Sequence, residues 1–240
     1  MAVKKTDTNY EISLQDLLEA GSHFGHQAKR WNPKMKPYIW QARDGVHIFD
    51  LVKTKDQLVK ACEAAKEMVK NNEIIVMVGT KRQAKAIIKE EALKAGMPYV
   101  THRWLGGTIT NWGQIETSIK KLNEMKEKTE KGEYKKYTKK ENILIQREIA
   151  RLEKIVGGLT NLKKTPEAIF VVDAKREYAA VKEANMKGIK VFAIVDSNCD
   201  PENIDYLIPA NDDAVRSIKL LVGTFAKAVA DGVNLRGKKK

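Results

Sequence analysis

Short apolar runs alternate with helical patterns along most of the chain. Six of these runs are rich in β-branched residues, namely "VHIFDL" (46–51), "IIVMVG" (74–79), "YVT" (99–101), "AIFVVD" (168–173), "VFAIVD" (191–196) and "YLI" (206–208). Such runs are typical of buried strands. Helical segments lie between several of them, and two have starts that match capping boxes, Thr54 with Gln57 and Thr80 with Gln83. The alternation predicts a three-layer α/β domain with helices on both faces of a mostly parallel sheet.

Residues 113–160 interrupt this alternation. Apolar residues there follow one another at spacings of four, three, four and three, at Ile145, Ile149, Leu152, Val156 and Leu159. This spacing is typical of a coiled-coil seam. The segment before it presents a second apolar helical face, made of Ile115, Ile119 and Leu122. The polar stretch "KGEYKKYTKK" (131–140) fits the turn between them, so we expect an antiparallel coiled-coil hairpin.

The ends of the chain lack such periodicity. We expect residues 1–9 to form a flexible N-terminus and residues 232–240, which end in "RGKKK", to form a flexible basic tail. Residues 10–112 and 161–231 then form a single α/β domain, and residues 113–160 form a hairpin inserted into it.

Composition narrows the class of protein. A chain of 240 residues, of which 42% are hydrophobic, can bury a core. No apolar run is long enough to span a membrane, and the opening "MAVKKTDTNYEISL" lacks the apolar stretch of a secretory signal. We therefore expect a cytoplasmic protein without a membrane partner. Cys62 and Cys199 form no C-x-x-C pair, which favours buried free thiols over a zinc knuckle or a disulfide.

Charge is unevenly distributed along the chain. Residues 166–215 hold ten acidic and five basic residues, a net charge of −5, which leaves +18 for the rest of a chain whose total is +13. A basic excess of this size favours a phosphate-bearing partner. We expect one face of the molecule to meet a polyanion and another to meet solvent or a protein.

The stretch "HFGHQAKRWNPKMKPYIW" (23–40) mixes cations with aromatic rings. Between Ala20 and Arg43 there is no acidic residue, and the cations are Lys29, Arg30, Lys34, Lys36 and Arg43. Cations neutralise phosphates, and exposed rings stack on unpaired bases. Trp31, Tyr38 and Trp40 could stack in this way. The alternative is that Trp31 and Trp40 anchor an irregular loop in the core.

The stretch "HRWLGGTITNW" (102–112) is a second candidate for nucleic-acid contact. Arg103 and Trp104 precede two glycines, which let backbone approach a partner closely. Asn111 can cap the next helix or donate to sugar and phosphate.

The turn after "IIVMVG" is a third candidate. Thr80, Lys81 and Arg82 follow Gly79 where a strand turns into a helix, and backbone amides there point toward an anion. The chain has no G-x-G-x-x-G and no G-x-x-x-x-G-K-[ST], so it lacks the cradle of nucleotide-binding enzymes. A nucleic-acid phosphate would suit Lys81 and Arg82 as well as a free nucleotide.

A metal site is a further alternative. His23 and His26 form an H-x-x-H pair, which would need a distant ligand such as His47, His102 or Asp200. No third ligand lies at a recognisable spacing, so ordinary packing of these histidines is the competing interpretation.

Hydrolysis by a side-chain nucleophile has little support. There is no G-x-S-x-G, and Ser197 and Cys199 in "VDSNCDP" have no identifiable base nearby. The polar side chains of this loop more simply hold its own backbone.

Six ordered stretches resemble one known family. They are "LLEAGSHFGHQAKRWNPKMKPYI", "VGTKRQA", "RWLGGTITN", "PEAIFVVDAKRE", "AIVDSNCDP" and "IPANDDAVRSI". In this order they look like the bacterial type of small-subunit ribosomal protein number two, over roughly residues 10 to 230.

The resemblance implies a Rossmann-like or flavodoxin-like domain with an inserted coiled-coil hairpin, no catalytic activity and no cofactor. It implies a place on the back of the small ribosomal subunit, contact with small-subunit ribosomal RNA, and help in retaining neighbouring proteins. One of these is the large RNA-gathering protein numbered one, which supports messenger RNA recruitment. The residues that we expect to contact RNA are Lys29, Arg30, Trp31, Lys34, Lys36, Arg43, Lys81, Arg82, Arg103, Trp104 and Asn111.

Overall fold

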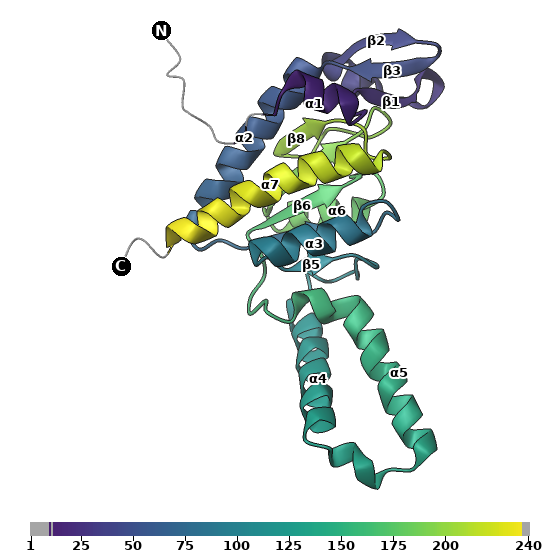
Figure 1. The fold of residues 1–240 in the computed structure, drawn as a ribbon, viewed down its shortest axis with the longest axis vertical. Coiled ribbons are helices and arrows are strands. Elements are labelled where there is room, and N and C mark those ends of the chain that lie inside the picture. Colours follow the sequence, from purple (N-terminus) through teal and green to yellow (C-terminus); the bar gives the residue numbers. More distant parts are fainter. Residues whose placement is uncertain (1–9, 11, 237–240) are drawn as a thin grey trace.

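A five-stranded parallel sheet forms the centre of the molecule (Figure 1). The computed structural model describes residue 10 and residues 12–236. In spatial order the strands are β5 (Tyr99–Val100), β4 (Ile75–Val78), β6 (Ala168–Val172), β7 (Lys190–Val195) and β8 (Tyr206–Pro209). Every neighbouring pair is parallel. The residues of β4 and β6 are all buried, as is usual for parallel strands that are covered on both faces.

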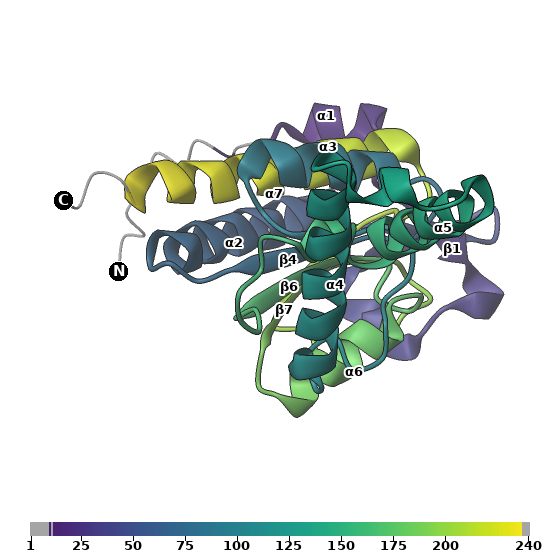
Figure 2. The ribbon, with the colours of Figure 1, turned by 90° about the horizontal axis from the view of Figure 1, so that it is seen from below.

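Helices cover both faces of this sheet, as Figure 2 shows. On one face lie α2 (Leu51–Lys70), α3 (Lys85–Ala95) and α7 (Val215–Arg236). There Phe170 stacks on Phe225 of α7, with ring centroids 4.1 Å apart. On the other face, α6 (Tyr178–Met186) and the base of the hairpin pack on alternate residues of the same strands. The predicted three-layer α/β architecture is confirmed.

A second, antiparallel sheet differs from the prediction. It has the order β1-β3-β2 and consists of β1 (Phe24–Gln27), β2 (Ile39–Arg43) and β3 (Val46–Phe49). The run at 46–51 therefore contributes to this small sheet and not to the parallel one, and the stretch before it is only partly a loop. Asp44 and Gly45 join β2 to β3 with φ of 51° and 74°, the conformation that a two-residue hairpin requires. The "DG" pair was the sequence signal for this hairpin.

The inserted segment forms two helices that leave the α/β domain and return to it (Figure 1). They are α4 (Trp112–Glu130) and α5 (Lys139–Val156), joined by the 3-10 turn η3 (Glu133–Lys136) and followed by η4 (Gly157–Leu159). Near the domain the two helices bury apolar residues, including Ile119, Leu122 and Leu152. The helices diverge toward the tip, where Ile143 and Leu144 of α5 are exposed. A coiled coil along the whole predicted seam is therefore not confirmed.

Two predicted helix starts are wrong, because the threonines involved serve distant partners. α2 is capped by Asp50, which accepts from the amide of Val52, whereas the Thr54 hydroxyl donates to the Pro209 carbonyl at 2.6 Å. α3 begins only at Lys85, and Thr80 bonds Glu177 instead. Both threonines are buried, at 0% and 7% exposure.

The ends of the domain pack against its body. Ser13 caps α1 (Leu14–Glu19) in a capping box with Asp16. At the other end α7 continues to Arg236, so residues 232–236, which the pattern assigned to the basic tail, are helical. The remainder of the two predicted flexible ends, 1–9 and 237–240, lies outside the described residues. Within the described part of the chain, no helix combines the length and apolar character that crossing a bilayer requires.

Candidate nucleic-acid interface

The cationic stretch lies on the small antiparallel sheet and on two 3-10 turns between β1 and β2. These turns are η1 (Ala28–Arg30) and η2 (Pro33–Tyr38). The stretch is anchored by Met35, which is 0% exposed, and by the amide of Asn32, which donates to the Ser197 carbonyl at 2.8 Å. The cations on either side of these anchors and between them are exposed, namely Lys29, Arg30, Lys34, Lys36 and Arg43.

Two of these five cations have ion-pair partners. Arg43 lies 3.9 Å from the neighbouring Asp44, and Lys34 is paired more closely. The Lys34 ammonium lies 2.9 Å from Asp200 Oδ2 and 2.8 Å from Glu202 Oε2. The hydrogen bonds to Glu202 and Asp200 raise the pKa of Lys34. Lys29, Arg30 and Lys36 have no ion pair among the described residues, so their charges are available to a phosphate.

The aromatic residues of the stretch are only partly exposed. Trp31 is half-buried, and its ring packs on that of His47 with centroids 4.8 Å apart. Trp40 on β2 is 68% exposed, so it is not a core anchor. Trp31 therefore fits the alternative of a residue that anchors the loop, whereas Trp40 faces solvent and could stack on a base.

Lys81 does not belong to this exposed set, because it lies inside a cluster of carboxylates at the carboxyl ends of the strands. Its ammonium is 2.6 Å from Asp212, 2.7 Å from Asp213 and 3.2 Å from Asp173. Burial alone would lower the pKa of Lys81, but these carboxylates prevail and raise it. Burial and the charges of neighbouring aspartates raise the pKa of Asp212 to about 7. Arg82, the next residue, is exposed.

Trp104 is also buried, at 6% exposure, and it is held by a carboxylate that the sequence analysis missed. Its indole Nε1 donates to Glu183 Oε1 at 3.1 Å. Glu183 also accepts from the backbone amides of Gly107 and Ile109, at 2.8 and 3.1 Å. Burial opposes ionisation of Glu183, but the backbone donors prevail and lower its pKa. The loop is thus built around Glu183, a buried acid of α6. The residues near Trp104 in the sequence do not indicate that this acid is its partner.

The neighbours of Trp104 in the predicted set are exposed. Arg103 faces solvent, and so does Asn111, which stands at the start of α4 without making a capping bond. Both remain available to a partner.

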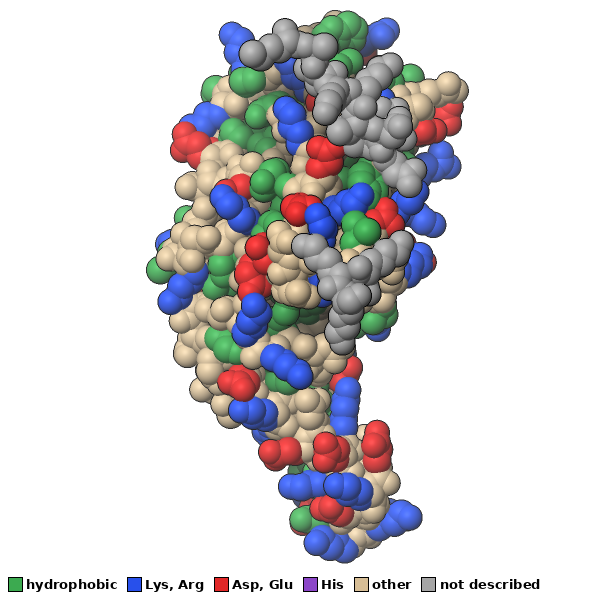
Figure 3. Space-filling model, turned by 90° about the vertical axis from the view of Figure 1, so that its left-hand side faces the viewer, with side chains coloured by type: hydrophobic (Ala, Val, Ile, Leu, Met, Phe, Trp, Pro, Cys, Tyr) green, Lys and Arg blue, Asp and Glu red, His purple; other side chains and the backbone are tan. Residues whose placement is uncertain are grey.

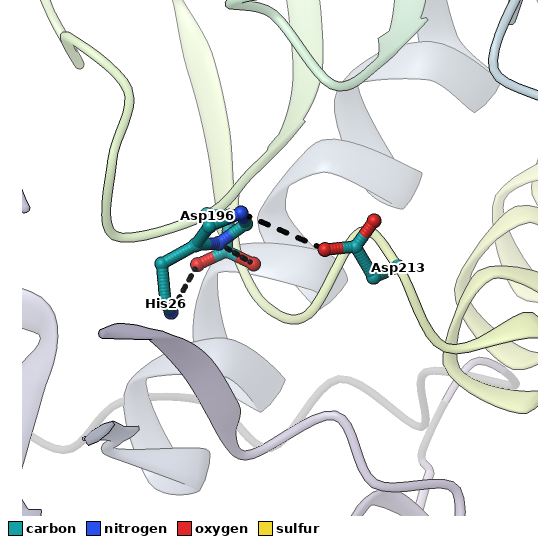
Figure 4. Close-up of side chains that lie close together, drawn as sticks. All are labelled: His26, Asp196 and Asp213. Carbon is teal, nitrogen blue, oxygen red and sulfur yellow. Dashed lines mark hydrogen bonds and ion pairs between the residues drawn. The ribbon is translucent and has the colours of Figure 1, made fainter. Parts of the chain in front are cut away.

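His26 lies between two carboxylates at the same edge of the parallel sheet (Figure 4). Its Nδ1 is 3.0 Å from Asp196 Oδ2, and its Nε2 is 3.6 Å from Asp213 Oδ2. The hydrogen bond to Asp196 raises the pKa of His26 against the effect of burial. These three residues are also the one group in the described chain whose geometry could hold a metal ion. Either an imidazole that carries protons on both nitrogens or a bound cation would satisfy these carboxylates, and the other histidines considered from sequence lie outside the group.

The acidic excess of residues 166–215 is divided between the interior and the surface. Four of its acids are buried, namely Glu177, Glu183, Asp196 and Asp212. They stabilise loops by accepting hydrogen bonds, as Asp196 does from Ser197 at the end of β7. The other six acids are partly or fully exposed, and the four exposed ones, Asp200, Glu202, Asp205 and Asp213, form ion pairs with lysines.

Comparison with known proteins agrees with this arrangement. The profile of the family described as ribosomal protein S2 matches residues 17–232. The chain belongs to the ribosomal protein S2 family. It is 50% identical to small ribosomal subunit protein uS2 of Chlorobaculum tepidum, over 93% of this chain and 88% of the relative. It is 49% identical to the protein of that name from Roseiflexus sp., over 94% and 86% of the two chains, and 48% identical to that of Chloroherpeton thalassium, over 92% and 88%.

In this S2-family chain the turn considered for nucleotide binding is filled by protein groups. The Thr80 amide donates to Glu177 Oε1 at 2.9 Å, and Arg176 Nε donates to the Thr80 hydroxyl oxygen at 3.1 Å. A Cβ on Gly79 would lie 2.7 Å from Ile88 Cγ1, so this glycine serves the packing of β4 on α3. A nucleotide phosphate at this turn would have to displace a buried carboxylate.

The loop "VDSNCDP" has a structural role in the same S2-family chain. The Ser197 hydroxyl accepts from the His26 amide at 2.8 Å and donates to Asp196 at 3.1 Å. Cys199 and Cys62 are free and buried, and burial raises the pKa of each thiol to about 12. Both thiols therefore stay protonated near neutral pH, and neither is activated as a nucleophile.

Proposed function

We propose that this chain is a structural component of the small ribosomal subunit that binds ribosomal RNA through exposed residues of the segment 23–43 and of the turns at 79–82 and 102–112. The observation that carries the proposal is membership of the S2 family over residues 17–232. The chain works in the cytoplasm and needs neither a cofactor nor a catalytic step.

The proposed RNA-binding surface consists of exposed residues of the three sequence stretches considered above, 23–43, 79–82 and 102–112. It comprises Lys29, Arg30, Lys36, Trp40, Arg43, Arg82, Arg103 and Asn111. Apart from Arg43, which lies 3.9 Å from Asp44, these cations have no ion pair among the described residues, so each can neutralise a phosphate and release a counterion. Lys34 takes part only if its pairs with Asp200 and Glu202 open. Lys81 and Trp104 are left out of the surface because they are buried.

Charge reversal tests this proposal. Lys29→Glu with Lys36→Glu should reduce incorporation of the chain into small subunits, measured by sedimentation of a gentle lysate through sucrose gradients at low and high salt. The change should leave the unfolding transition in place, because both side chains are exposed.

The matched control is Lys60→Glu with Lys227→Glu, which makes the same change of charge on α2 and α7. Both lysines are exposed, and neither has an ion pair among the described residues. Figure 3 shows the side of the molecule that faces left in Figure 1, where basic and acidic side chains are interspersed. Equal incorporation of the two double variants would contradict the proposed surface.

We also propose that the chain helps to retain neighbouring small-subunit proteins, including the large RNA-gathering protein numbered one. The support is the family resemblance of the ordered sequence stretches. Small subunits depleted of this chain should lose that protein from the gradient fraction and regain it when the chain is added back. Unchanged retention after depletion would contradict this second part alone.

A further inference from the structure

A groove of about 840 Å³ lies beside α6, and none of the contacts described above fills it. One wall is α6, the other is the loop 198–204, and Asn32 of the cationic stretch stands at the rim. Ligand sites commonly have volumes of about 300–1,000 Å³. The groove is therefore large enough for a nucleotide and continuous with the proposed RNA-binding surface.

The wall formed by α6 carries an aromatic ring where the helix has no covering element. Tyr178, Lys182 and Asn185 follow one another at spacings of four and three, so they share one side of the helix. Ala180 and Ala184 on another side are 0% exposed and pack in the core. Tyr178 is 64% exposed although it lines a concave site. An exposed ring in a groove is a platform on which a flat group can stack.

The charge of the groove favours an anion. Its two acids, Asp200 and Glu202, are both paired with Lys34. The two lysines that line the groove, Lys175 and Lys182, have no ion pair in the part of the chain that the structure describes. The groove therefore offers two cations whose charges are not used within the protein.

Amide groups supply a third kind of contact. Asn185 Nδ2 donates to the carbonyls of Val181 and Asn203, at 2.8 and 2.9 Å, which fixes the helix against the loop. Asn198 and Asn203 line the same groove, and their side-chain amides have no hydrogen bond within the described residues. Asparagine amides both donate and accept, as the edges of bases do.

We infer that this groove binds an unpaired nucleotide of RNA, with its base stacked on Tyr178 and its phosphates beside Lys175 and Lys182. The amides of Asn198 and Asn203 meet the base edge. This inference rests on the proposed function, because it extends the same interface from phosphate contact to recognition of a single-stranded base. A duplex does not fit the assignment, since its bases are already stacked.

The test measures binding of the full chain to small-subunit ribosomal RNA at several salt concentrations, with variants of Tyr178. Tyr178→Ala should weaken affinity about 5-fold or more, which is what loss of one base–aromatic stack produces, whereas Tyr178→Phe should stay within about twofold of the unmodified chain. The control is Leu93→Ala on α3, which removes another large side chain of similar exposure, 60%, and should not change affinity. Unfolding transitions of all variants establish that each is folded.

The outcomes separate this inference from the proposed function. If the unmodified chain fails to bind the RNA, the proposed function fails and the groove assignment fails with it. If the unmodified chain binds in a salt-dependent way and Tyr178→Ala binds equally well, the function stands and the groove assignment is overturned. A loss that Tyr178→Phe shares with Tyr178→Ala also overturns it, because the ring is retained in that variant.

Discussion

Two segments of this chain contain the same Lys-Arg pair, at 29–30 and at 81–82, but the first lysine is exposed and the second is buried. In the stretch 28–38 the turns η1 and η2 hold their cations outward, and Lys29 and Lys36 have no described ion pair. At the end of β4, Lys81 is enclosed by Asp173, Asp212 and Asp213. The difference is a matter of partners supplied from distant parts of the chain. A lysine that follows a glycine turn can bind a phosphate only if no carboxylate of the folded chain already pairs with its ammonium.

Removing the enclosed ammonium should have the largest effect on stability. Lys81→Met leaves three carboxylates without their cation, and we expect a loss of about 3–5 kcal/mol in the free energy of unfolding, measured by urea denaturation at pH 7. Arg82→Met is the matched control, since this neighbour is exposed, and it should change stability by less than about 0.5 kcal/mol. Equal effects of the two changes would remove the contrast between the segments.

Glu183→Ala should have the next largest effect. It leaves the Trp104 indole and the amides of Gly107 and Ile109 without an acceptor, so we expect a loss of about 2–3 kcal/mol. Glu183→Gln keeps an acceptor oxygen and should lose less. Thermal unfolding followed by tryptophan fluorescence checks both variants. An unaltered melting temperature in Glu183→Ala would show that the loop does not depend on this acid.

The pH dependence of stability should reveal the ion pairs of His26 with a smaller effect. The hydrogen bond to Asp196 raises the pKa of His26, so its contribution is full below the unfolded value of about 6.5 and is lost as pH rises through the folded value. Burial lowers the pKa values of His23 and His47, so these two histidines make the free energy of unfolding rise with pH, opposite to the effect of His26. Comparing the chain with His26→Gln between pH 6 and 8.5 isolates His26. A stability difference that is constant with pH would count against the ion pairs.

Changes on the exposed segment should affect stability least and RNA binding most. We expect a triple change to alanine, at Lys29, Arg30 and Lys36, to shift the free energy of unfolding by less than about 0.5 kcal/mol per residue. The slope of log affinity for ribosomal RNA against log salt should become shallower by about 2–3, because three phosphate contacts are lost. An unchanged slope would mean that these cations do not touch phosphate.

The sequence was a good guide to the parallel sheet, because buried strands leave local signals. The runs that became β4, β6 and β7 are apolar at nearly every position, and local composition is sufficient to detect them. The antiparallel sheet was missed although Asp44 and Gly45 marked its hairpin, because β2 is exposed at four of its five positions and has no alternation of buried and exposed residues.

The candidate site was less predictable for a physical reason. Exposed cations such as Lys36 could be selected from composition, but the fate of Lys81 depended on Asp212, 131 residues away in the chain. The environment of Trp104 likewise depended on Glu183, 79 residues away. No local pattern reports which buried charges will meet across such separations.

The anchoring of the cationic stretch also sets an order of events during synthesis. The amides of His26 and Asn32 are held by Asp196 and Ser197, and His26 and Asp196 are 170 residues apart in the chain. Translation at about 5–20 residues per second places on the order of 10 s or more between the emergence of these two segments. Until β7 and the loop after it leave the ribosome, the turns η1 and η2 lack the hydrogen bonds that Asp196 and Ser197 provide. A nascent or truncated chain therefore presents its cations without these fixing contacts, and the RNA recognition proposed here would begin only after residues 196 and 197 have been made.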